Sequence, residues 1–235
     1  MTDKAQAYAP GVYGLVGGAV NVYVVDDAES GLTIIDVGLP GSVKDILALV
    51  HDIGRMPQDV RHILITHADI DHVGSLKGLV AATGARVYAS ADSAMYIQRR
   101  QSPPHIPFPM TIPARIVGLL ALRAVPVDQL VADGDVLDIA GGMRVLATPG
   151  HTPDHVSFFW ERERVLFAGD LFRNMADGLS LTLPRITHDV NTAQQSARSA
   201  LALDPAVICP GHGQVWSAAE APEQARALLA ALPGG

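Results

Sequence analysis

Four side chains that can bind a metal ion lie within six consecutive positions of one short segment. Residues 65–74 read ITHADIDHVG and contain His67, Asp69, Asp71 and His72. A single Asp or His in a loop more often caps a helix or forms a turn. Carboxylates held this close together, however, repel one another unless a cation or hydrogen bonds compensate. Because imidazole and carboxylate groups are common ligands of divalent cations, the segment predicts a metal site.

Three more side chains of the ligand type follow apolar segments further along the chain. His151 stands in PGHT after MRVLAT, Asp170 ends LFAGD, and His212 follows AVIC in PGHG. Any one of them alone would usually be a turn residue. All three nevertheless come where a predicted strand ends, beside glycines that let backbone segments approach closely. This shared placement predicts that they join the first four side chains in one site.

The elements that must position these side chains begin with alternating strand and helix patterns. β-Branched and aromatic residues predict a hairpin and a third strand, which form a small antiparallel sheet at the start. Ser42 is the predicted N-cap of the first helix, and Gly54 is its predicted end. The predicted strands span residues 11–18, 21–27, 31–38, 61–66 and 85–90, and the predicted helices span 43–54, 75–83 and 91–100.

The second half of the chain repeats the strand pattern and ends in helices. The predicted hairpins pair residues 135–139 with 143–148 and 155–160 with 165–169, and a helix at 192–203, a strand at 206–209 and a helix at 219–232 follow. Two sheets with helices outside them account for this order. Because no linker or low-complexity segment interrupts it, we predict one domain over residues 1–235.

Residues 102–126 form an apolar, Pro-rich insertion that interrupts the alternation of predicted strands and helices. The segment carries six prolines around a short core, residues 116–122, that is apolar on nearly every side. This core is too short to span a bilayer. It is consistent with a buried crossover helix, with a lid over a site, or with a dimer contact, because an apolar surface excursion needs a partner. A lid would favour a small-molecule substrate with an apolar part, and a dimer contact would make the protein a homodimer.

The composition is typical of one catalytic-sized domain and narrows the classes of partner. Of the 235 residues 49% are hydrophobic and 17% charged, enough to bury a large core. The net charge of -7 argues against nucleic acid, whose binding requires clustered Lys and Arg. No apolar leader opens the chain, and no window reaches the roughly 18 apolar residues of a membrane span. With Cys209 as the single cysteine, we expect a cytoplasmic protein in a reducing compartment and no membrane partner.

Taken together, the motifs resemble the metallo-β-lactamase fold superfamily. Its hallmark is T-H-x-H-x-D-H-x-G followed by Gly-His, Gly-Asp and Gly-His, and this chain has THADIDHVG, PGHT, AGD and PGHG in that order. AVNVYVV and IIDVGLPGS near the start extend the resemblance over about residues 12–215. The resemblance implies the α/β fold class, in the form of an αββα sandwich of two mixed β-sheets flanked by helices. It also implies a site along one edge, between the two sheets.

The resemblance further implies a ligand set for two metal ions. One metal would be held by His67, Asp69 and His151, the second by Asp71, His72 and His212, with Asp170 bridging the pair. Asp69 departs from the pattern, because most members have a second His there. A carboxylate is still a good zinc ligand, and it suits iron or manganese better than imidazole does. We therefore expect two divalent metal ions, zinc first, with iron and manganese as alternatives.

Such a site implies hydrolysis without a nucleophile from the protein. Two divalent cations can share a water, lower its pKa towards roughly 7 and present hydroxide to an electrophilic carbon or phosphorus. We expect a dinuclear metallohydrolase, with Asp71 and Asp170 as its candidate catalytic carboxylates. The substrate would be of the ester, lactone, thioester or phosphoester type, and a β-lactam is also open. The alternative is a di-iron oxidoreductase of the same fold, which usually needs an electron donor, and no flavin-binding domain is evident.

Residues beside the motifs offer supporting roles. Asp36, at the end of TIIDVG, could accept a hydrogen bond that orients a ligating His, or it could be an ordinary turn residue. For His155 and His188, contact with substrate or support of a ligand is an alternative to a structural role. The remaining histidines give weaker grounds for any such role, and they are His51, His62 and His105.

Overall fold

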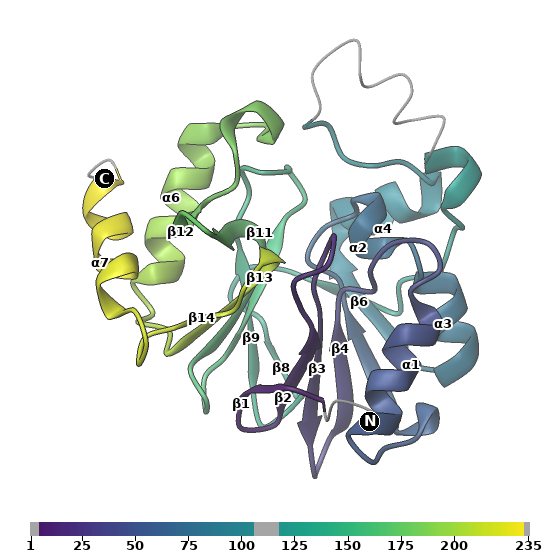
Figure 1. Ribbon diagram of the computed structural model, residues 1–235. Coiled ribbons are helices and arrows are strands. Elements are labelled where there is room, and N and C mark those ends of the chain that lie inside the picture. The colour runs from purple at the N-terminus through teal and green to yellow at the C-terminus, as the bar shows by residue number, and fades with distance from the viewer. Residues whose placement is uncertain (1–4, 106–117, 233–235) are drawn as a thin grey trace.

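Two β-sheets of seven strands each face one another, and helices cover the outer face of each sheet (Figure 1). The computed structural model describes residues 5–105 and 118–232. The first half of the chain forms one sheet with its helices, and the second half forms the other. This architecture confirms the predicted α/β sandwich of the αββα type, with two mixed sheets flanked by helices.

The first sheet is antiparallel at its beginning and parallel at its end. Its strands follow chain order and are β1 (Ala7–Ala9), β2 (Val12–Leu15), β3 (Val22–Asp27), β4 (Gly31–Ile35), β5 (Val60–Leu64), β6 (Arg86–Ser90) and β7 (Gln129–Val131). The pairs from β1 to β4 are antiparallel, and those from β4 to β7 are parallel. Helices of the parallel half return the chain across the sheet, and they are α1 (Val43–Asp52), α2 (Ile70–Val73), α3 (Leu76–Thr83) and α4 (Ala91–Arg99), with a 3-10 turn at Pro57–Asp59.

The second sheet is antiparallel except for one parallel pair in its centre, β11 with β13. Its strands are β8 (Val136–Leu137), β9 (Met143–Ala147), β10 (Val156–Trp160), β11 (Val165–Met175), β12 (Gly178–Leu181), β13 (Val207–Gly213) and β14 (Trp216–Ser217). A 3-10 turn at Pro184–Ile186 and the helices α6 (Val190–Leu201) and α7 (Pro222–Ala231) complete this half. Figure 1 shows α6 and α7 on the side of the sheet that faces away from the first half.

Three layers of apolar side chains correspond to the three interfaces of the sandwich. Ile46 of α1 and Ile63 of β5 belong to the layer between the first sheet and its helices. Leu64, the next residue of β5, points to the opposite face and packs between the two sheets with Phe158. Phe172 belongs to the layer beneath α6 and α7. Each such side chain contributes roughly 1.5–3 kcal/mol through burial, so both sheets are held on both faces.

Two sequence predictions for the first half are corrected by the fold. The opening strands are not a separate small sheet, because β4 pairs in parallel with β5 and continues the same sheet. This pairing depends on the crossover through α1, which local patterns do not reveal. Ser42 occupies the N-cap position of α1, but its side chain makes no capping hydrogen bond. Its backbone is already helical, with φ -71° and ψ -8°, whereas a capping side chain usually needs an extended backbone.

The sequence predicts that Asp170 and His212 stand at strand ends. In the structure both lie inside the two central strands of the second sheet. β11 runs five residues beyond Asp170, to Met175, and β13 includes His212. The pairing of β11 with β13 shifts register on both sides of Gly169, whose φ is +49°. Such an irregularity redirects side chains within a continuous strand. The short strands β1, β7, β12 and β14 and the short helix α2 were not predicted at all.

The Pro-rich insertion at residues 102–126 is described only at its two ends, because residues 106–117 lie outside the described residues. At one end, Ser102 and His105 line a pocket together with Asp69. At the other end, Leu122 and Val125 are buried against the first sheet and its helices. The insertion therefore reaches the predicted site at one end and the core at the other. The predicted dimer contact stays a prediction.

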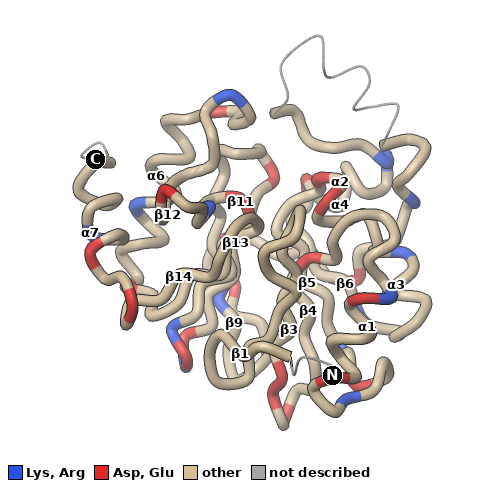
Figure 2. The backbone as a smooth tube through the Cα atoms, in the orientation of Figure 1, with Lys and Arg blue, Asp and Glu red and all other residues tan. Residues whose placement is uncertain are grey.

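Figure 2 shows Lys and Arg interspersed with Asp and Glu along the described part of the chain. Among the helices of residues 5–105 and 118–232, none is long and apolar enough to cross a bilayer.

Candidate metal centre

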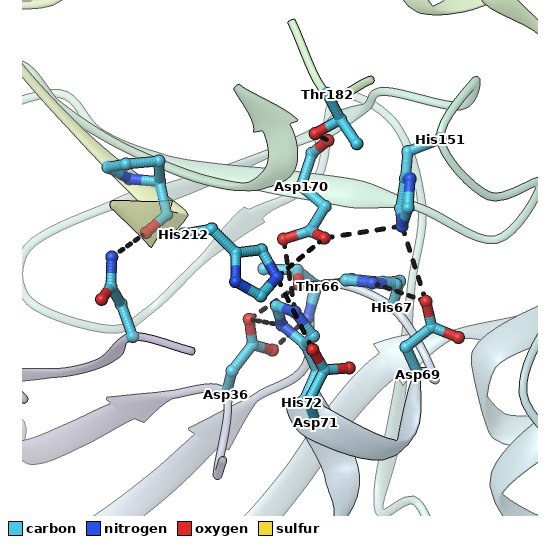
Figure 3. A network of polar contacts seen from close by, with 12 residues as sticks. Asp36, Thr66, His67, Asp69, Asp71, His72, His151, Asp170, Thr182 and His212 are labelled. Carbon is cyan, nitrogen blue, oxygen red and sulfur yellow. Dashed lines mark hydrogen bonds and ion pairs between the residues drawn. The ribbon is translucent and has the colours of Figure 1, made fainter. Parts of the chain in front are cut away.

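The fold brings all seven predicted metal-ligand side chains together at one edge of the sandwich, between the two sheets (Figure 3). His67 and Asp69 lie in the loop between β5 and α2, and α2 itself carries Asp71 and His72. The second sheet supplies the others, which are His151 from the loop after β9, Asp170 of β11 and His212 of β13. The central strands of both sheets thus hold the cluster, and its geometry depends on how the sheets pack.

The first group consists of His67, Asp69 and His151, whose ligand atoms all lie within 4.8 Å of one another. Nε2 of His67 is 3.4 Å from Oδ2 of Asp69, and Nε2 of His151 is 3.5 Å from the same oxygen. The three side chains are 0%, 9% and 3% exposed, respectively. A cation held here would therefore be almost fully shielded from solvent.

The second group consists of Asp71, His72 and His212, whose ligand atoms also lie within 4.8 Å of one another. Nε2 of His212 is 3.6 Å from Oδ2 of Asp71. His72 is fully buried, but the side chains of Asp71 and His212 are 29% and 31% exposed. This group is consequently open to solvent on one side.

Asp170 lies between the two groups and contacts both. Its Oδ2 is 3.5 Å from Nε2 of His151 in the first group and 3.2 Å from Nε2 of His212 in the second. Its Oδ1 is 3.3 Å from Nε2 of His72. A carboxylate whose Oδ2 lies near both donor sets is well placed to bridge two cations.

Asp36 orients the imidazole rings of His72 and His67, the first directly and the second through Thr66. Oδ2 of Asp36 lies 2.8 Å from Nδ1 of His72 and also accepts a hydrogen bond of 2.8 Å from the hydroxyl of Thr66. The Thr66 hydroxyl in turn lies 3.0 Å from Nδ1 of His67. Since that hydroxyl proton goes to Asp36, its oxygen accepts from His67. Both rings therefore carry their proton on Nδ1 and direct the Nε2 lone pair at the site, as metal-binding histidines do.

The carboxylates give the site a strong preference for positive charge. Burial opposes charging of the His72 ring, but Asp170 and Asp36 outweigh it and raise the pKa of His72 well above its ordinary value. Burial likewise opposes ionisation of Asp170, but the His72 and His212 rings hold its pKa well below the usual range. For Asp69, burial is outweighed by His151 and His67, and its pKa is also lowered. The same field attracts a divalent cation.

The donor atoms of the cluster fit a metal ion because several of them are buried without a hydrogen-bond partner. Among the described residues, the unpartnered atoms include Nε2 of His67, His72 and His151, and one oxygen each of Asp69 and Asp170. Leaving such groups unpaired costs about 1–3 kcal/mol each, and more for charged ones. A cation among them would satisfy these donors together, and the mixture of nitrogen and oxygen atoms suits zinc, iron or manganese.

Close backbone approach around the cluster depends on Gly169 and Gly211. A Cβ atom on Gly169 would lie 2.6 Å from Nε2 of His155 and 2.8 Å from Cβ of Thr66. A Cβ atom on Gly211 would collide with the carboxylate of Asp170 and lie 2.9 Å from Cε1 of His72. Both glycines therefore let the central strands of the second sheet approach the residues that follow β5.

His155 supports the site from behind rather than facing the pocket. Its Nε2 accepts a hydrogen bond of 3.0 Å from the backbone N–H of Asp170, and its Nδ1 lies 2.8 Å from the hydroxyl of Thr148. Burial, together with the nearby His67 and His151 rings, lowers its pKa well below the ordinary value, so the ring is neutral. Because its Nε2 is occupied, His155 positions Asp170 and does not bind metal.

Asp154, which sequence reasoning did not select, links the two halves of the molecule beneath the site. Its Oδ2 accepts hydrogen bonds of 2.9 Å from the backbone N–H of Ala68 and 2.6 Å from the hydroxyl of Ser93. Ala68 lies between His67 and Asp69, so this carboxylate fixes the loop that carries both. The available signal was its place in TPGHTPDH, between His151 and His155.

The other histidines differ in how they relate to the cluster. His51 and His188 are exposed, and only the backbone N–H of His188 approaches the site, donating to the carbonyl of His151 at 2.9 Å. His62 faces the Tyr88 hydroxyl, with Nδ1 at 3.0 Å. His105, by contrast, lies in the pocket with its Nε2 3.3 Å from Oδ2 of Asp69. Sequence reasoning gave His105 little weight, because it matches no motif of the family.

Five of the seven clustered side chains line a pocket of about 520 Å³, and they are Asp69, Asp71, His151, Asp170 and His212. Its lining combines ligand-type side chains with an apolar wall. The apolar wall comprises Ala19, Leu39, Ile70 and Ile186. Among the described residues that line it, none is Lys or Arg. The pocket can therefore place an apolar group against the wall while a polar group faces the cluster.

The chain is similar in sequence to hydrolases and similar in structure to solved proteins of the same fold. The chain is 29% identical over 224 residues to a probable metallo-hydrolase, YflN, of Bacillus subtilis (strain 168), covering 87% of this chain and 84% of the relative. It is 32% identical over 217 residues to a hydroxyacylglutathione hydrolase of Methylobacterium sp. (strain 4-46), covering 91% and 68%. The solved structure of Rm3 metallo-beta-lactamase superposes with a TM-score of 0.72 at 24% identity, covering 98% and 91%.

These relatives indicate an enzyme of the general hydrolase type, and the fold implies divalent metal ions. The model of the Metallo-beta-lactamase superfamily matches residues 15–212, which is most of the chain and includes all seven clustered side chains. The chain therefore belongs to the metallo-β-lactamase superfamily.

Proposed function

We propose that the protein is a dinuclear metallohydrolase that acts on an ester-type bond in a small molecule with an apolar part. The observation that carries this proposal is the position of Asp170, whose carboxylate contacts both His151 of the first donor group and His212 of the second. A single metal site would not need two donor groups joined by one carboxylate. Carboxylic esters, lactones, thioesters and phosphoesters all contain the electrophilic centre that such a site attacks.

The seven clustered side chains would hold the two ions, and the ions would supply Lewis acidity and a water of lowered pKa. His67, Asp69 and His151 would form one ligand set, and Asp71, His72 and His212 the other, with Asp170 shared. Zinc is the first expectation, because these nitrogen and oxygen donors are its usual ligands. Asp69 makes iron or manganese stronger competitors than they would be with imidazole at that position.

The chain's own contribution to the reaction is to position groups and move a proton. Asp170 is only 6% exposed and is held from behind, since its backbone N–H donates to His155 and its backbone carbonyl accepts from the Thr182 hydroxyl at 2.5 Å. Asp71 is 29% exposed and lines the pocket. Of the two candidate catalytic carboxylates, Asp71 is therefore the one placed to exchange a proton with the leaving group or with solvent.

The pocket supports the apolar part of the proposed substrate. Leu39 and Ile186 line the pocket and are 39% and 37% exposed, so they offer apolar surface that an apolar group of a substrate could cover. Together with Ala19 and Ile70 they line the same pocket as the donor groups. One relative is named a hydroxyacylglutathione hydrolase, so a thioester belongs in the first set of substrates to test. With no Lys or Arg among the described lining residues, uncharged esters and lactones belong there as well.

The test is to measure metal content and hydrolysis on the same preparation. The purified protein is analysed for zinc, iron and manganese and assayed with matched uncharged esters, lactones, thioesters and phosphoesters of short and long acyl groups. We expect about two metal ions per chain, activity that a chelator removes and the metal restores, and preference for apolar acyl groups. Metal occupancy without hydrolysis of any class would contradict the proposal. Two irons with a visible absorption band and oxygen consumption would support the oxidoreductase instead.

The proposal also includes a cytoplasmic homodimer. Cys209 is buried and unpaired, which suits a reducing compartment. Leu120, at the described end of the insertion, is 72% exposed and would be covered in a dimer. Sedimentation analysis should then give twice the mass of the chain, and a monomer at all concentrations would exclude this part of the proposal.

A further inference from the structure

His105 lies at the first donor group although it belongs to none of the family motifs. It follows α4 at the start of the Pro-rich insertion, and its side chain is only 8% exposed. Its Nε2 is 3.3 Å from Oδ2 of Asp69, and its ring centroid is 4.9 Å from that of His151. It therefore adds a third imidazole to those of His67 and His151 around one carboxylate oxygen.

The protonation of the His105 ring is determined by a backbone carbonyl. Its Nδ1 lies 3.1 Å from the carbonyl oxygen of Pro103. A carbonyl oxygen can only accept a hydrogen bond, so Nδ1 carries the proton and the neutral ring keeps a lone pair on Nε2. This lone pair and the Asp69 carboxylate are both acceptors. Two acceptors 3.3 Å apart repel each other, unless a cation lies between them.

The same arrangement occurs in three side chains of the proposed ligand set. His67 and His72 donate from Nδ1 to Thr66 and Asp36, and His212 donates from Nδ1 to the carbonyl of Ala19 at 2.7 Å. In each, Nε2 faces a carboxylate oxygen at 3.2–3.4 Å. His155, which also lies nearby, differs because its Nε2 accepts the Asp170 N–H. His105 thus shares the geometry of the ligands and not that of the supporting histidine.

The distances from Oδ2 of Asp69 would allow each neighbouring imidazole to share a metal ion with this oxygen. Two ligand atoms about 2.1 Å from an ion at a tetrahedral angle lie roughly 3.4 Å apart. The Nε2 atoms of His67, His151 and His105 lie 3.4, 3.5 and 3.3 Å from Oδ2 of Asp69. His105 therefore stands at the same separation as the two motif histidines.

We propose that His105 is an additional nitrogen ligand of the first metal ion, supplied by the Pro-rich insertion. It would provide the imidazole that Asp69 replaces in the motif, from a different part of the chain. The inference rests on the proposed dinuclear site and adds one ligand to it. With His67, Asp69, His151 and the shared Asp170, the first ion would have at least five protein ligands, which favours metals that accept five or six.

The first experiment compares metal binding by His105→Ala with that by His51→Ala, a control histidine exposed on α1. Stoichiometry and affinity are measured by competition with a chelator, and the coordination number is followed by the visible absorption of bound Co²⁺. We expect His105→Ala to lower the affinity for one of the two ions by about tenfold or more. The visible absorption spectrum of bound Co²⁺ should also change. The control should match the wild type. Unchanged affinity and spectrum in His105→Ala would overturn the proposal.

A second measurement uses the wild-type chain and does not depend on whether a variant folds. Histidine labelled with ¹⁵N is incorporated, ¹¹³Cd²⁺ is bound, and the ring nitrogens coupled to cadmium are counted by NMR. We expect five coupled Nε2 atoms, from His67, His72, His105, His151 and His212. Four coupled rings without His105 would overturn this inference alone and leave the dinuclear site intact. A chain that binds no metal would overturn both proposals.

Discussion

The two donor groups of the site differ most in exposure. The side chains of His67, Asp69 and His151 are between 0% and 9% exposed, whereas Asp71 and His212 are 29% and 31% exposed. Both groups contribute to the pocket lining, the first through Asp69 and His151 and the second through Asp71 and His212, but the side chains of the first group are far less exposed. We infer that the first group would hold its ion more firmly. Solvent and substrate would reach the second group first. The predictions for His151, His212 and Asp36 test this difference directly, and the others concern the site as a whole.

The largest loss of activity and metal content is expected on substitution of Asp170, which joins the two groups. Asp170→Ala removes the only described carboxylate that contacts both His151 and His212, so both ions should bind weakly. We expect activity to fall on the order of a thousandfold or more and metal content to fall at both positions. Metal analysis and kcat/KM on one preparation check this. Full occupancy by two ions with ordinary turnover would show that Asp170 does not link the groups.

Removing one ligand from each group should distinguish them. His151→Ala should lose the shielded ion and His212→Ala the exposed one, each with roughly a hundredfold or greater loss of activity. Because bound metal stabilises the folded state, both should also lower the melting temperature of the loaded protein. We expect the greater loss of stability in His151→Ala, since its ion is the more firmly held. Equal metal content, turnover and melting temperature to the wild type in either variant would refute the ligand assignment.

Asp36 should affect the two groups unequally. It contacts His72 of the exposed group directly but reaches His67 of the buried group only through Thr66. Asp36→Asn tolerates the backbone φ of +56°, but an amide cannot accept both hydrogen bonds at Oδ2 if its nitrogen occupies that place. We expect a 10–100-fold loss of metal affinity, larger for the second ion. Stepwise metal titration measures both constants, and equal losses would contradict the direct role at His72.

Asp69 sets the charge of the buried group. In the proposed site two divalent cations would bring four positive charges against three carboxylates, and a His at position 69 would leave only two. Asp69→His should therefore lower the pKa of the activated water, move the acid limb of the pH–rate profile down by roughly one unit and favour zinc over manganese or iron. Protein reconstituted with a single metal provides the measurement. An acid limb that stays or moves up, with occupancy intact, would show that Asp69 does not set this charge.

The smallest effect concerns stability and the neutral ring of His155. Burial lowers the pKa of His155 in the folded chain, so its contribution to stability is fully present above the unfolded pKa of about 6.5 and is lost as pH falls below it. His155→Gln should thus destabilise the metal-free protein by roughly 1–2 kcal/mol at pH 7.5 and by less at pH 5. Urea unfolding of both proteins at the two pH values measures the difference. A difference that grows towards pH 5 would be inconsistent with a neutral ring.

Much of the fold was predictable because strands and helices leave local patterns of apolar, turn and capping residues in the sequence. The strands β3, β4, β6 and β10 and the helices α1, α3 and α4 all fall within predicted segments. β1, β7 and β14 have only two or three residues each, which is too short for a pattern, and they depend on neighbouring strands for pairing. The continuity of the first sheet was missed because parallel pairing of β4 with β5 is a contact between distant residues.

The sequence alone determined which side chains could bind metal, because ligand chemistry and motif spacing are local properties of residues 67–72 and of the later Gly-His and Gly-Asp motifs. Only the tertiary structure decided how they are arranged. The register shift at Gly169 places Asp170 between the donor groups, and the return of the chain after α4 brings His105 to Asp69, 36 residues earlier. Neither contact has a local signature, since both arise from how distant segments pack.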